Sequence, residues 1–348
     1  MQFSRQLSGA FFLVMLLSTG LCRGQAQKGS EVKIGFAIEN IRGERWQTDL
    51  DEFQRRAQEL GASVMTRDAR GDDDVQLHQV EELLEDSIDV LVFLPHDTAK
   101  ASPIVEAAHA KNVPVISYDR LASAPVDLYV GFDLFSVGML QAASLIEKAP
   151  KGNYLLLGGS RQDGNSRIVR AGQMKVLQPL IERRVIRVVA DIWVPEGSGT
   201  QAYLLVSEKL GHLDVPLTAI VASNDSIAGG AIQALEDSKL AGQVFVSGQD
   251  ADLAAVERLF AGTQVMTVYK PAAKEARTAA EAAVKLARHE SVQGMLVANG
   301  DRTTKAVLLA PIAVTAQNAK DTVFKDGFQK PEMVKQGLPK EKWAELEK

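Results

Sequence analysis

The sequence predicts an α/β protein built from doubly wound parallel sheets. Short apolar runs alternate with longer amphipathic stretches, beginning with a strand pattern at 32–38 and a helical pattern at about 44–60. Most of the short runs are apolar on both faces, as in parallel strands that helices cover from two sides. Roughly ten such strands exceed one ordinary open sheet, so we expect two similar lobes of about five or six strands each.

The predicted elements follow one another in a βαβ rhythm along the chain. The run Asp72 to Asp74 favours a helix start, because carboxylates complement the helix dipole there. No Pro-, Gly- or Ser-rich linker divides the chain, which fits lobes joined by several short crossings. Residues 330–348 are polar and Lys-rich, and we expect a surface tail with an exposed helical turn or two at 340–347. The strands are expected at 32–38, 63–67, 89–94, 113–117, 128–132, 153–157, 185–192, 219–222, 244–247 and 265–268.

The N-terminus has the pattern of an export signal. Arg5 supplies a positive start, residues 10–17 (AFFLVMLL) an apolar centre, and Gly24-Gln25-Ala26 a small-x-small cleavage site. We therefore expect residues 1–26 to be a signal peptide, cleaved after Ala26, and the mature protein to be periplasmic. The apolar run is short for a membrane span, although an uncleaved anchor stays an alternative.

Cys22 offers a second interpretation of this segment, as the lipidated first residue of a lipoprotein. Lipoprotein signals resemble a pattern with a small residue directly before the cysteine, and the bulky Leu21 stands there instead. The anchored form is therefore the minor alternative. Because Cys22 is the single cysteine of the chain, an internal disulfide is excluded.

Composition and motifs argue against several function classes. The 39 basic and 44 acidic residues are nearly balanced, which gives no global positive charge for nucleic acid. A phosphate loop, a nucleophile elbow and a zinc pair are missing from the sequence, and no cofactor or metal is predicted. The turn at Gly158-Gly159-Ser160 is interpreted as a tight strand-to-helix connection. Among the histidines, only His96 follows a strand end where it could face a cleft.

Polar and aromatic residues gather directly after the predicted strands, where open α/β sheets bind their ligands. Carboxylates and amides bond to vicinal hydroxyls, arginine offers a fixed fork of donors, and an indole covers the apolar face of a pyranose. The strand ends therefore predict carbohydrate binding. They read Glu39-Asn40 with Arg45-Trp46 following, Tyr118-Asp119-Arg120, Asp163-Gly164-Asn165, Trp193, Ser223-Asn224-Asp225, Gln249-Asp250 and Tyr269-Lys270.

Each of these residues also has a purely structural interpretation. Asp119-Arg120 could form a surface ion pair, Asn224-Asp225 could cap a helix, and Trp193 could belong to the core. Their recurrence at equivalent places favours a ligand site, because the structural explanation has to be invoked separately at every strand end.

Six motifs, in order, resemble the type I periplasmic sugar-binding proteins of ABC transporters. The resemblance runs from about residue 31 to residue 328, and SGQDADL and MTVYKP are similar to the branch that binds D-xylose. The motifs are ERWQ at 44–47, Tyr118-Asp119-Arg120, RAGQMKVL at 170–177, ASND at 222–225, SGQDADL at 247–253 and MTVYKP at 266–271.

The resemblance implies two lobes joined by a three-segment hinge, with the sugar between them. It places lobe one at 30–136 and 271–301, lobe two at 137–270 and 302–327, and a polar C-terminal tail at 328–348. The implied substrate contacts are Arg45, Trp46, Asp119 and Arg120 from lobe one, Asp163, Asn165, Trp193, Asn224 and Asp250 from lobe two, and Lys270 at the hinge.

Two departures from the family pattern lie near the mouth of the implied cleft. Glu39-Asn40 stands where an acidic pair is expected, and the stretch 194–200 is shortened and lacks a second tryptophan. Affinity and fine selectivity are the properties that these departures put in question.

The expected function is capture of a pentose, D-xylose first, by a monomer that closes on it and delivers it to an ABC permease. An alternative is a sugar-sensing subunit that hands the closed form to a chemoreceptor or sensor kinase. Less favoured is a sugar-active enzyme. A retaining glycosidase needs two carboxyl groups about 5–5.5 Å apart, one with a raised pKa, for which Asp119, Asp163 and Asp250 are the available side chains.

Overall fold

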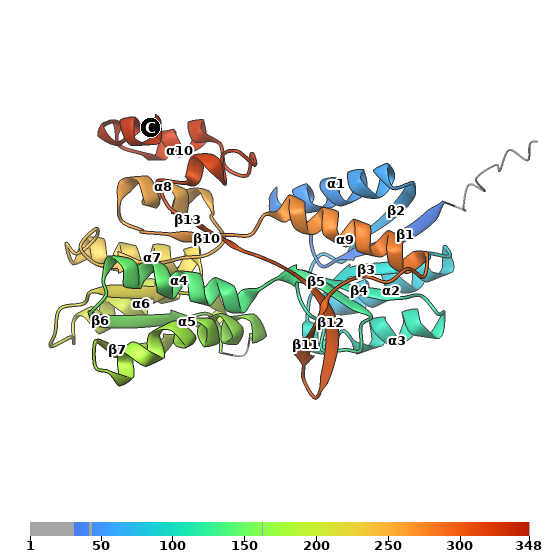
Figure 1. The fold of residues 1–348 in the computed structure, drawn as a ribbon, viewed down its shortest axis with the longest axis horizontal. Helices are drawn as coiled ribbons and strands as arrows, with labels where there is room; N and C mark the ends of the chain where they lie inside the picture. Colours follow the sequence, from blue (N-terminus) through green and yellow to red (C-terminus); the bar gives the residue numbers. More distant parts are fainter. Residues whose placement is uncertain (1–30, 42–43, 162, 348) are drawn as a thin grey trace, which may run out of the picture. The chain divides into compact units, whose positions relative to one another are not determined.

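The computed structural model describes residues 31–41, 44–161 and 163–347, and only the backbone of residues 44, 45, 345 and 347. The expected signal peptide, with Cys22 and the cleavage site after Ala26, lies outside the described residues. Within the described part of the chain, strands form sheets of seven, four and two members, with helices between most of them (Figure 1). The predicted α/β class is confirmed.

The seven-stranded first sheet has the order β11-β12-β5-β4-β3-β1-β2. Its neighbours pair in parallel, except that β11 runs antiparallel to β12. The strand order reverses between β1 and β3, which is the position where doubly wound sheets open a crevice for ligands. The strands are β1 (Val32–Ile38), β2 (Ala62–Asp68), β3 (Val90–Leu94), β4 (Val115–Tyr118), β5 (Leu128–Phe132), β11 (Met295–Asn299) and β12 (Arg302–Leu309).

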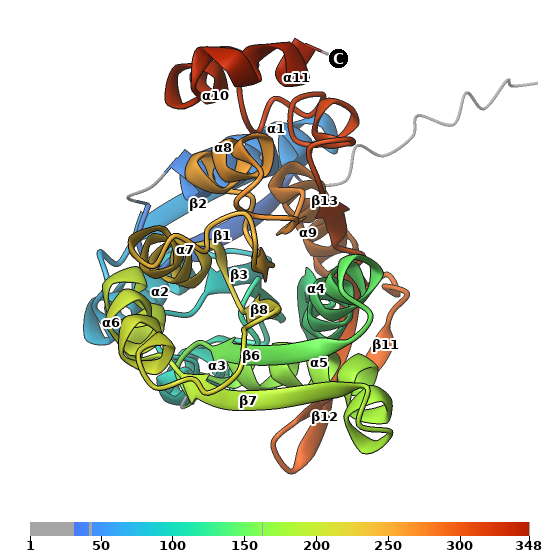
Figure 2. The ribbon, with the colours of Figure 1, turned by 90° about the vertical axis from the view of Figure 1, so that its left-hand side faces the viewer.

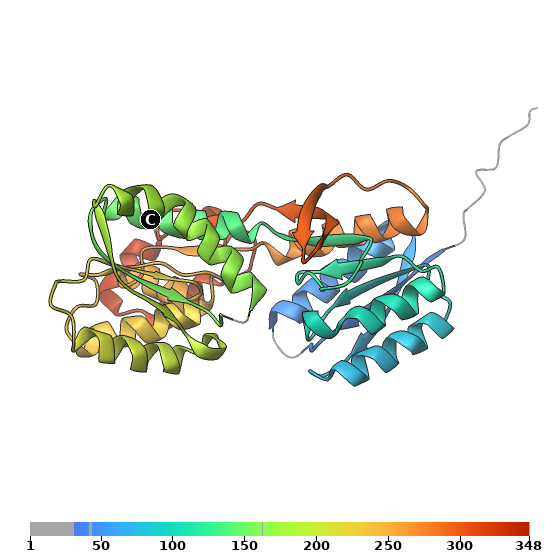
Figure 3. The same cartoon turned by 90° about the horizontal axis from the view of Figure 1, so that it is seen from below.

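Helices cover both faces of the first sheet (Figure 3). On one face, α1 (Glu44–Glu59) and α9 (Ala272–Ala287) pack together, and the fully buried Phe53 of α1 meets the ring of Phe36 edge to face. Burying a side chain of this size stabilises the fold by about 1.5–3 kcal/mol. On the other face lie α2 (Asp73–Glu85) and α3 (Ser102–Ala110).

The predicted start of α2 is confirmed by its cap. The carboxylate of Asp72 accepts hydrogen bonds from the backbone N–H groups of Asp74 and Val75, and Asp73 and Asp74 occupy the first turn. Such a cap satisfies donors that a helix start leaves open, and it contributes about 1 kcal/mol.

The four-stranded second sheet is parallel throughout, in the order β7-β6-β8-β9 (Figure 2). One face packs against α4 (Leu134–Lys148) and α5 (Gly164–Glu182), and the other against α6 (Gly199–Leu210) and α7 (Asp225–Asp237). The strands are β6 (Gly152–Gly158), β7 (Ile186–Trp193), β8 (Ala219–Ala222) and β9 (Phe245–Val246).

Helices α4 and α5 touch through two glycines. A Cβ on Gly138 would lie 1.9 Å from the carbonyl oxygen of Val169, and one on Gly172 would lie 2.0 Å from that of Phe135. Real side chains do not approach a backbone atom so closely, so this helix pair requires glycine at both positions. The requirement explains the glycine within the motif RAGQMKVL.

A two-stranded antiparallel sheet joins β10 (Thr267–Tyr269) to β13 (Ile312–Val314). Near it lie α8 (Leu253–Ala261) and the C-terminal helices α10 (Pro331–Gly337) and α11 (Trp343–Glu347). Short 3₁₀ turns span Thr98–Lys100, Pro195–Gly197, Ala319–Asp321 and Lys340–Lys342.

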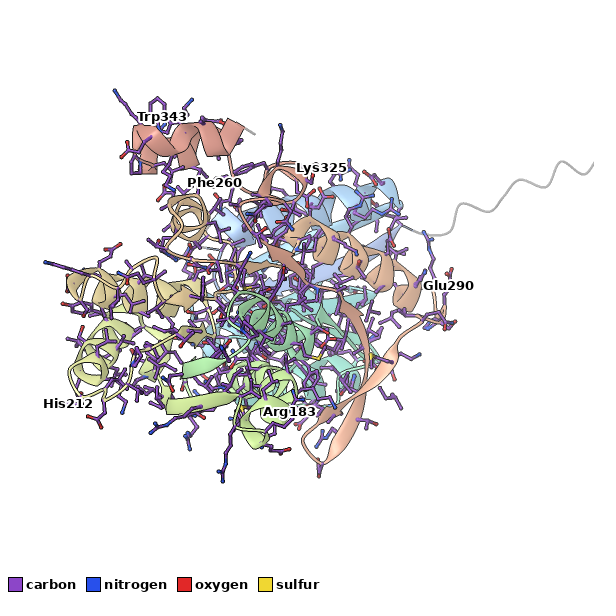
Figure 4. All side chains as sticks on the ribbon, turned by 60° about the vertical axis from the view of Figure 1, so that its left-hand side comes forward. Arg183, His212, Phe260, Glu290, Lys325 and Trp343 are labelled. Carbon is purple, nitrogen blue, oxygen red and sulfur yellow. The ribbon has the colours of Figure 1, made fainter. Side chains whose placement is uncertain are left out.

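The prediction of a polar surface tail at the C-terminus was wrong for the segment around α10. Val334 and Leu338 are buried in one apolar cluster with Phe260 of α8, and Trp343 packs against that cluster. Figure 4 labels Phe260 and Trp343 on these neighbouring helices. The polar composition of the segment hid a few apolar side chains, because two or three suffice to attach a short helix to a core.

All ten expected strands are present, but the prediction missed β11, β12 and β13. The first two lack the pattern of a strand buried on both faces, since β11 is mostly exposed and β12 begins with exposed Arg302 and Thr303. Because β12 pairs with β5 and β11, residues 302–309 belong to the first sheet. The sequence-based assignment of 302–327 to lobe two was therefore wrong for this stretch.

Between elements of the first sheet and those of the other two, the described chain crosses at residue 133, at 270–271 and at 310–311. The backbone N–H of Asp133 donates to the carbonyl of Leu309, which ties two of these crossings together. Asp133 also caps α4 through Ser136. Among the described residues, none of the helices combines the length and apolarity that crossing a membrane requires.

Candidate functional site

A cavity of about 1050 Å³ lies between the loops after β3 and β4, the turn that joins β11 to β12, and the start of α5. Three predicted contacts, Arg120, Asp163 and Asn165, line it together with His96 and Asn299. The other predicted residues are not in its lining. The cavity is at the upper end of the size of small-molecule sites, so it has room for a monosaccharide and water.

Arg120 is held by acceptors that follow β1 and β3. Its Nη2 lies 2.9 Å from Oε1 of Glu39, and its Nη1 donates to the carbonyl of Pro95 at 3.2 Å. The other oxygen of Glu39 lies 3.1 Å from Nδ1 of His96. The alternative interpretation of Asp119-Arg120 as an ion pair is wrong, because the ion-pair partner of Arg120 is Glu39.

Asp119 occupies a tight turn directly after β4. Its φ of +58° is in the left-handed region, its N–H donates to the carbonyl of Val130, and its own carbonyl accepts from the hydroxyl of Tyr129. These backbone contacts fix the position of the residue at the strand end.

The pair Arg45-Trp46 begins α1. Trp46 is half-buried and packs against the first core, while the side chain of Arg45 lies outside the described part.

Two predicted contacts of the second sheet also cap helices. The carboxylate of Asp163 accepts from the backbone N–H groups of Asn165 (3.1 Å) and Ser166 (2.9 Å) at the start of α5. Oδ1 of Asn224 accepts from the N–H of Ile227 at 2.9 Å at the start of α7. The capping interpretation of Asn224 is therefore confirmed. The cap uses only the side-chain oxygen, so the amide group keeps its donors for a ligand.

Trp193 stands at the end of β7, half-buried. A Cβ on Gly158 would lie 2.9 Å from Cε3 of the indole, so the ring rests directly on the backbone of β6. Two guanidinium groups lie over the ring, that of Arg170 at 5.0 Å and that of Arg161 at 5.1 Å from its centroid. Cation–π contacts of this kind orient an aromatic side chain.

Asp250 and Lys270 form an ion pair of 3.1 Å between the loop after β9 and the crossing after β10. Asp250 has a φ of +103°, and its N–H donates to the carbonyl of Val268. Lys270 is mostly buried and Asp250 half-exposed, so the carboxylate can still accept from a ligand.

The sequence-based set of contacts omitted the buried carboxyl of Asp225, in the first turn of α7. Thr267 Oγ1 and Gln264 Nε2 each donate to it at 2.8 Å, and the N–H of Asp252 donates at 3.2 Å. Burial, with the charges of Asp252 and Asp250, raises its pKa well above the usual range, against the opposing effect of Thr267 and Gln264. The motif ASND contains Asp225, but the sequence does not indicate that Gln264 and Thr267 pack against its carboxyl group.

The side chains at the strand ends have the chemistry that suits a neutral, hydroxyl-rich ligand. Arg120 and Asp250 occur in ion pairs, Asn165 and Asn224 supply amide groups, and Trp46 and Trp193 are half-buried indoles. Such a set offers hydrogen bonds in both directions without a net charge to attract an ion. Within the described residues, no three His, Cys, Asp or Glu side chains gather as metal ligands.

Comparison with known proteins identifies the family of the chain. Residues 34–291 match the family model described as periplasmic binding protein domain, so the chain belongs to this family of binding proteins.

Individual relatives narrow the class. The chain is 44% identical over 320 residues to the D-xylose-binding periplasmic protein of Escherichia coli, covering 91% of this chain and 97% of that one. It is 45% identical over 306 residues to the protein of that name from Haemophilus influenzae, covering 87% and 92%. Among solved structures, a carbohydrate transporter solute binding protein from Chloroflexus aurantiacus in complex with D-glucose superposes with a TM-score of 0.75 at 27% identity, covering 89% and 99%.

Proposed function

We propose that this protein is a periplasmic receptor that binds D-xylose between two lobes and delivers it to an ABC permease. The observation that carries the proposal is the 44–45% identity to two D-xylose-binding periplasmic proteins over nearly their whole length. The strand-end chemistry supports it independently, because paired charges, amides and indoles suit a neutral sugar.

The proposed contacts divide between the two sheets. Trp46 and Trp193 stack on opposite faces of the sugar ring, and the polar groups bond to its hydroxyls. Glu39 and Lys270 already hold Arg120 and Asp250 at the strand ends, so little side-chain entropy is lost on binding. The polar contacts are Arg45, Asp119, Arg120, Asp163, Asn165, Asn224, Asp250 and Lys270.

The chain crossings at 133, 270–271 and 310–311 are the proposed hinge. The sugar binds the closed form better, because only there do both sets of contacts reach it, and closure is then a shift of population. The closed form is the one presented to the permease. We further propose that residues 1–26 direct export and that the mature receptor acts as a monomer.

The test of ligand choice is calorimetric titration of the mature protein with D-xylose, D-ribose, L-arabinose and D-glucose in one buffer. We expect D-xylose to bind best, with D-glucose roughly ten- to hundredfold weaker. The extra CH₂OH group of glucose must be fitted into a closed site, and overpacking costs about 1–3 kcal/mol. Equal or tighter binding of D-glucose would contradict the assignment to D-xylose.

The test of the site is Trp193→Ala. Loss of a large buried aromatic contact should weaken D-xylose binding by about 2–4 kcal/mol. Trp343→Ala is the matched control, because Trp343 lies on α11 in the C-terminal cluster. Wild-type affinity in Trp193→Ala would remove this indole from the proposed contacts.

A further inference from the structure

A chain of buried polar side chains runs beneath the carboxyl edge of the second sheet. Arg170 and Gln173 of α5 and Gln141 of α4 are at most 7% exposed. Nε of Arg170 donates to Oε1 of Gln173 at 2.8 Å, and Nε2 of Gln173 donates to Oε1 of Gln141 at 2.7 Å. The motif RAGQMKVL contains two of these residues, and no sugar contact accounts for them.

Both ends of this chain reach proposed sugar contacts. At one end, Nε2 of Gln141 donates at 3.0 Å to the carbonyls of Ser223 and Gly248. Ser223 directly precedes Asn224, and Gly248 lies two residues before Asp250. At the other end, the guanidinium of Arg170 lies over the ring of Trp193. The three side chains thus connect three strand-end loops that are separate in the sequence.

The chemistry of Arg170 argues for a role beyond packing. A buried cation is costly unless it is paired, and well-packed apolar residues often stabilise a core as well as an ion pair does. Here Asp191 accepts from Nη1 and Gln173 from Nε, while Nη2 has no hydrogen-bond partner among the described residues. Hydrogen bonds between buried polar groups restrict the arrangements that the linked side chains can adopt.

We propose that Arg170, Gln173 and Gln141 are positioning residues that hold Trp193, Asn224 and Asp250 in their sugar-binding arrangement. The inference rests on the proposed function, because those three residues are its contacts. Arg170 fixes the plane of the indole above Gly158, and Gln141 fixes the spacing of the loops after β8 and β9.

The first test is Arg170→Met, which keeps an unbranched apolar side chain in the core and removes the guanidinium. D-xylose binding should weaken about tenfold, the effect of losing a desolvated cation–π contact with its hydrogen bonds. In a Trp193→Ala background the same change should have little further effect on affinity. Arg56→Met is the control, because Arg56 pairs with Glu59 and Glu281 at the end of α1 and should leave affinity unchanged.

A second measurement needs no sugar. In a Trp46→Phe, Trp343→Phe background Trp193 is the sole tryptophan, and Arg170→Met should increase its quenching by acrylamide and shift its emission. Failure of the unaltered protein to bind D-xylose would overturn the proposed function, while this fluorescence change would still decide whether Arg170 orders the indole.

Asp191→Asn covers the case in which Arg170→Met does not fold. Asp191 is half-exposed, so its change removes the charge that pairs with Arg170 with little effect on the core, and D-xylose affinity should fall about two- to threefold. Affinity within error of wild type in both variants, additive effects with Trp193→Ala, or unchanged Trp193 fluorescence would overturn the proposal.

Discussion

The carboxyl edges of the two sheets hold their proposed contacts in different ways. At the first sheet, Arg120 is fixed by Glu39 and a carbonyl, in ion pairs that water reaches. At the second, the buried Arg170 lies over Trp193, and the buried Gln141 bonds to the loops that carry Asn224 and Asp250. The comparison teaches that the proposed contact Arg120 at the first edge is fixed by an ion pair and a carbonyl, whereas buried polar groups at the second edge hold other residues in place. Changes at the second edge should therefore reduce both stability and affinity.

The largest expected effect is on the helix pair beneath the second sheet. Gly138→Ala places a Cβ against the carbonyl of Val169 and must separate α4 from α5, so we expect a loss of about 3 kcal/mol in the free energy of unfolding. Urea denaturation measures it. Gly211→Ala, whose nearest neighbour would be at an ordinary 3.5 Å, is the control. Equal stability of the two variants would contradict the close contact.

A smaller effect on affinity is expected at Gly158. An added Cβ would press on the indole of Trp193 at 2.9 Å and on Nη2 of Arg170 at 3.2 Å. We expect Gly158→Ala to tilt the ring and weaken D-xylose binding by about tenfold, or 1.4 kcal/mol. Calorimetry and Trp193 fluorescence give the two readouts, and tight binding with an unshifted emission spectrum would argue against a fixed ring.

At the first edge, we expect Glu39→Gln to lower the affinity for D-xylose and to leave the free energy of unfolding nearly unchanged. It removes the charge that holds Arg120 and leaves the carbonyl of Pro95, so binding should weaken about three- to tenfold, while unfolding changes by less than about 1 kcal/mol. Glu59→Gln on α1 is the control for loss of an ion pair away from the strand ends. A stability loss as large as that of Gly138→Ala would erase the contrast between the two edges.

The most gradual effect is the pH dependence contributed by Asp225. Because burial raises its pKa, the folded protein keeps a proton that the unfolded chain releases above its ordinary pKa of 3.8. The stability it contributes is full below that pKa and is lost as the pH rises through the folded pKa. The unfolding free energy of wild type minus that of Asp225→Asn should therefore fall as the pH rises above 3.8. A difference that grows with pH would show the opposite shift.

The sequence predicted the buried strands well because their pattern is local. Strands such as β3 are apolar on both faces, and that pattern is readable without knowing a partner. In contrast, β12 is half polar and acquires its place only by inserting between β11 and β5. The short C-terminal helix α10 likewise depends on contact with Phe260. The elements that the sequence did not predict therefore depend on contacts between segments that lie far apart in the chain.

The candidate site divides in the same way. The strand-end positions of Asp119, Trp193 and Asp250 followed from the predicted strands, and their role as contacts stays a prediction. The pairing of Arg120 with Glu39 and the network through Gln141 could not be predicted, because their partners lie on other elements. Side-chain geometry needs the fold before it can be specified.

The late insertion of β12 has a consequence for the order of synthesis and folding. β5 ends at Phe132, but its neighbour β12 begins only at Arg302, and the cluster around Phe260 waits for Val334 and Leu338. Neither half of the chain can complete its native contacts until nearly all of it has left the ribosome. Contacts between such distant segments close slowly. A polypeptide with this connectivity therefore stays unfolded for longer than one whose sheet neighbours follow one another along the chain.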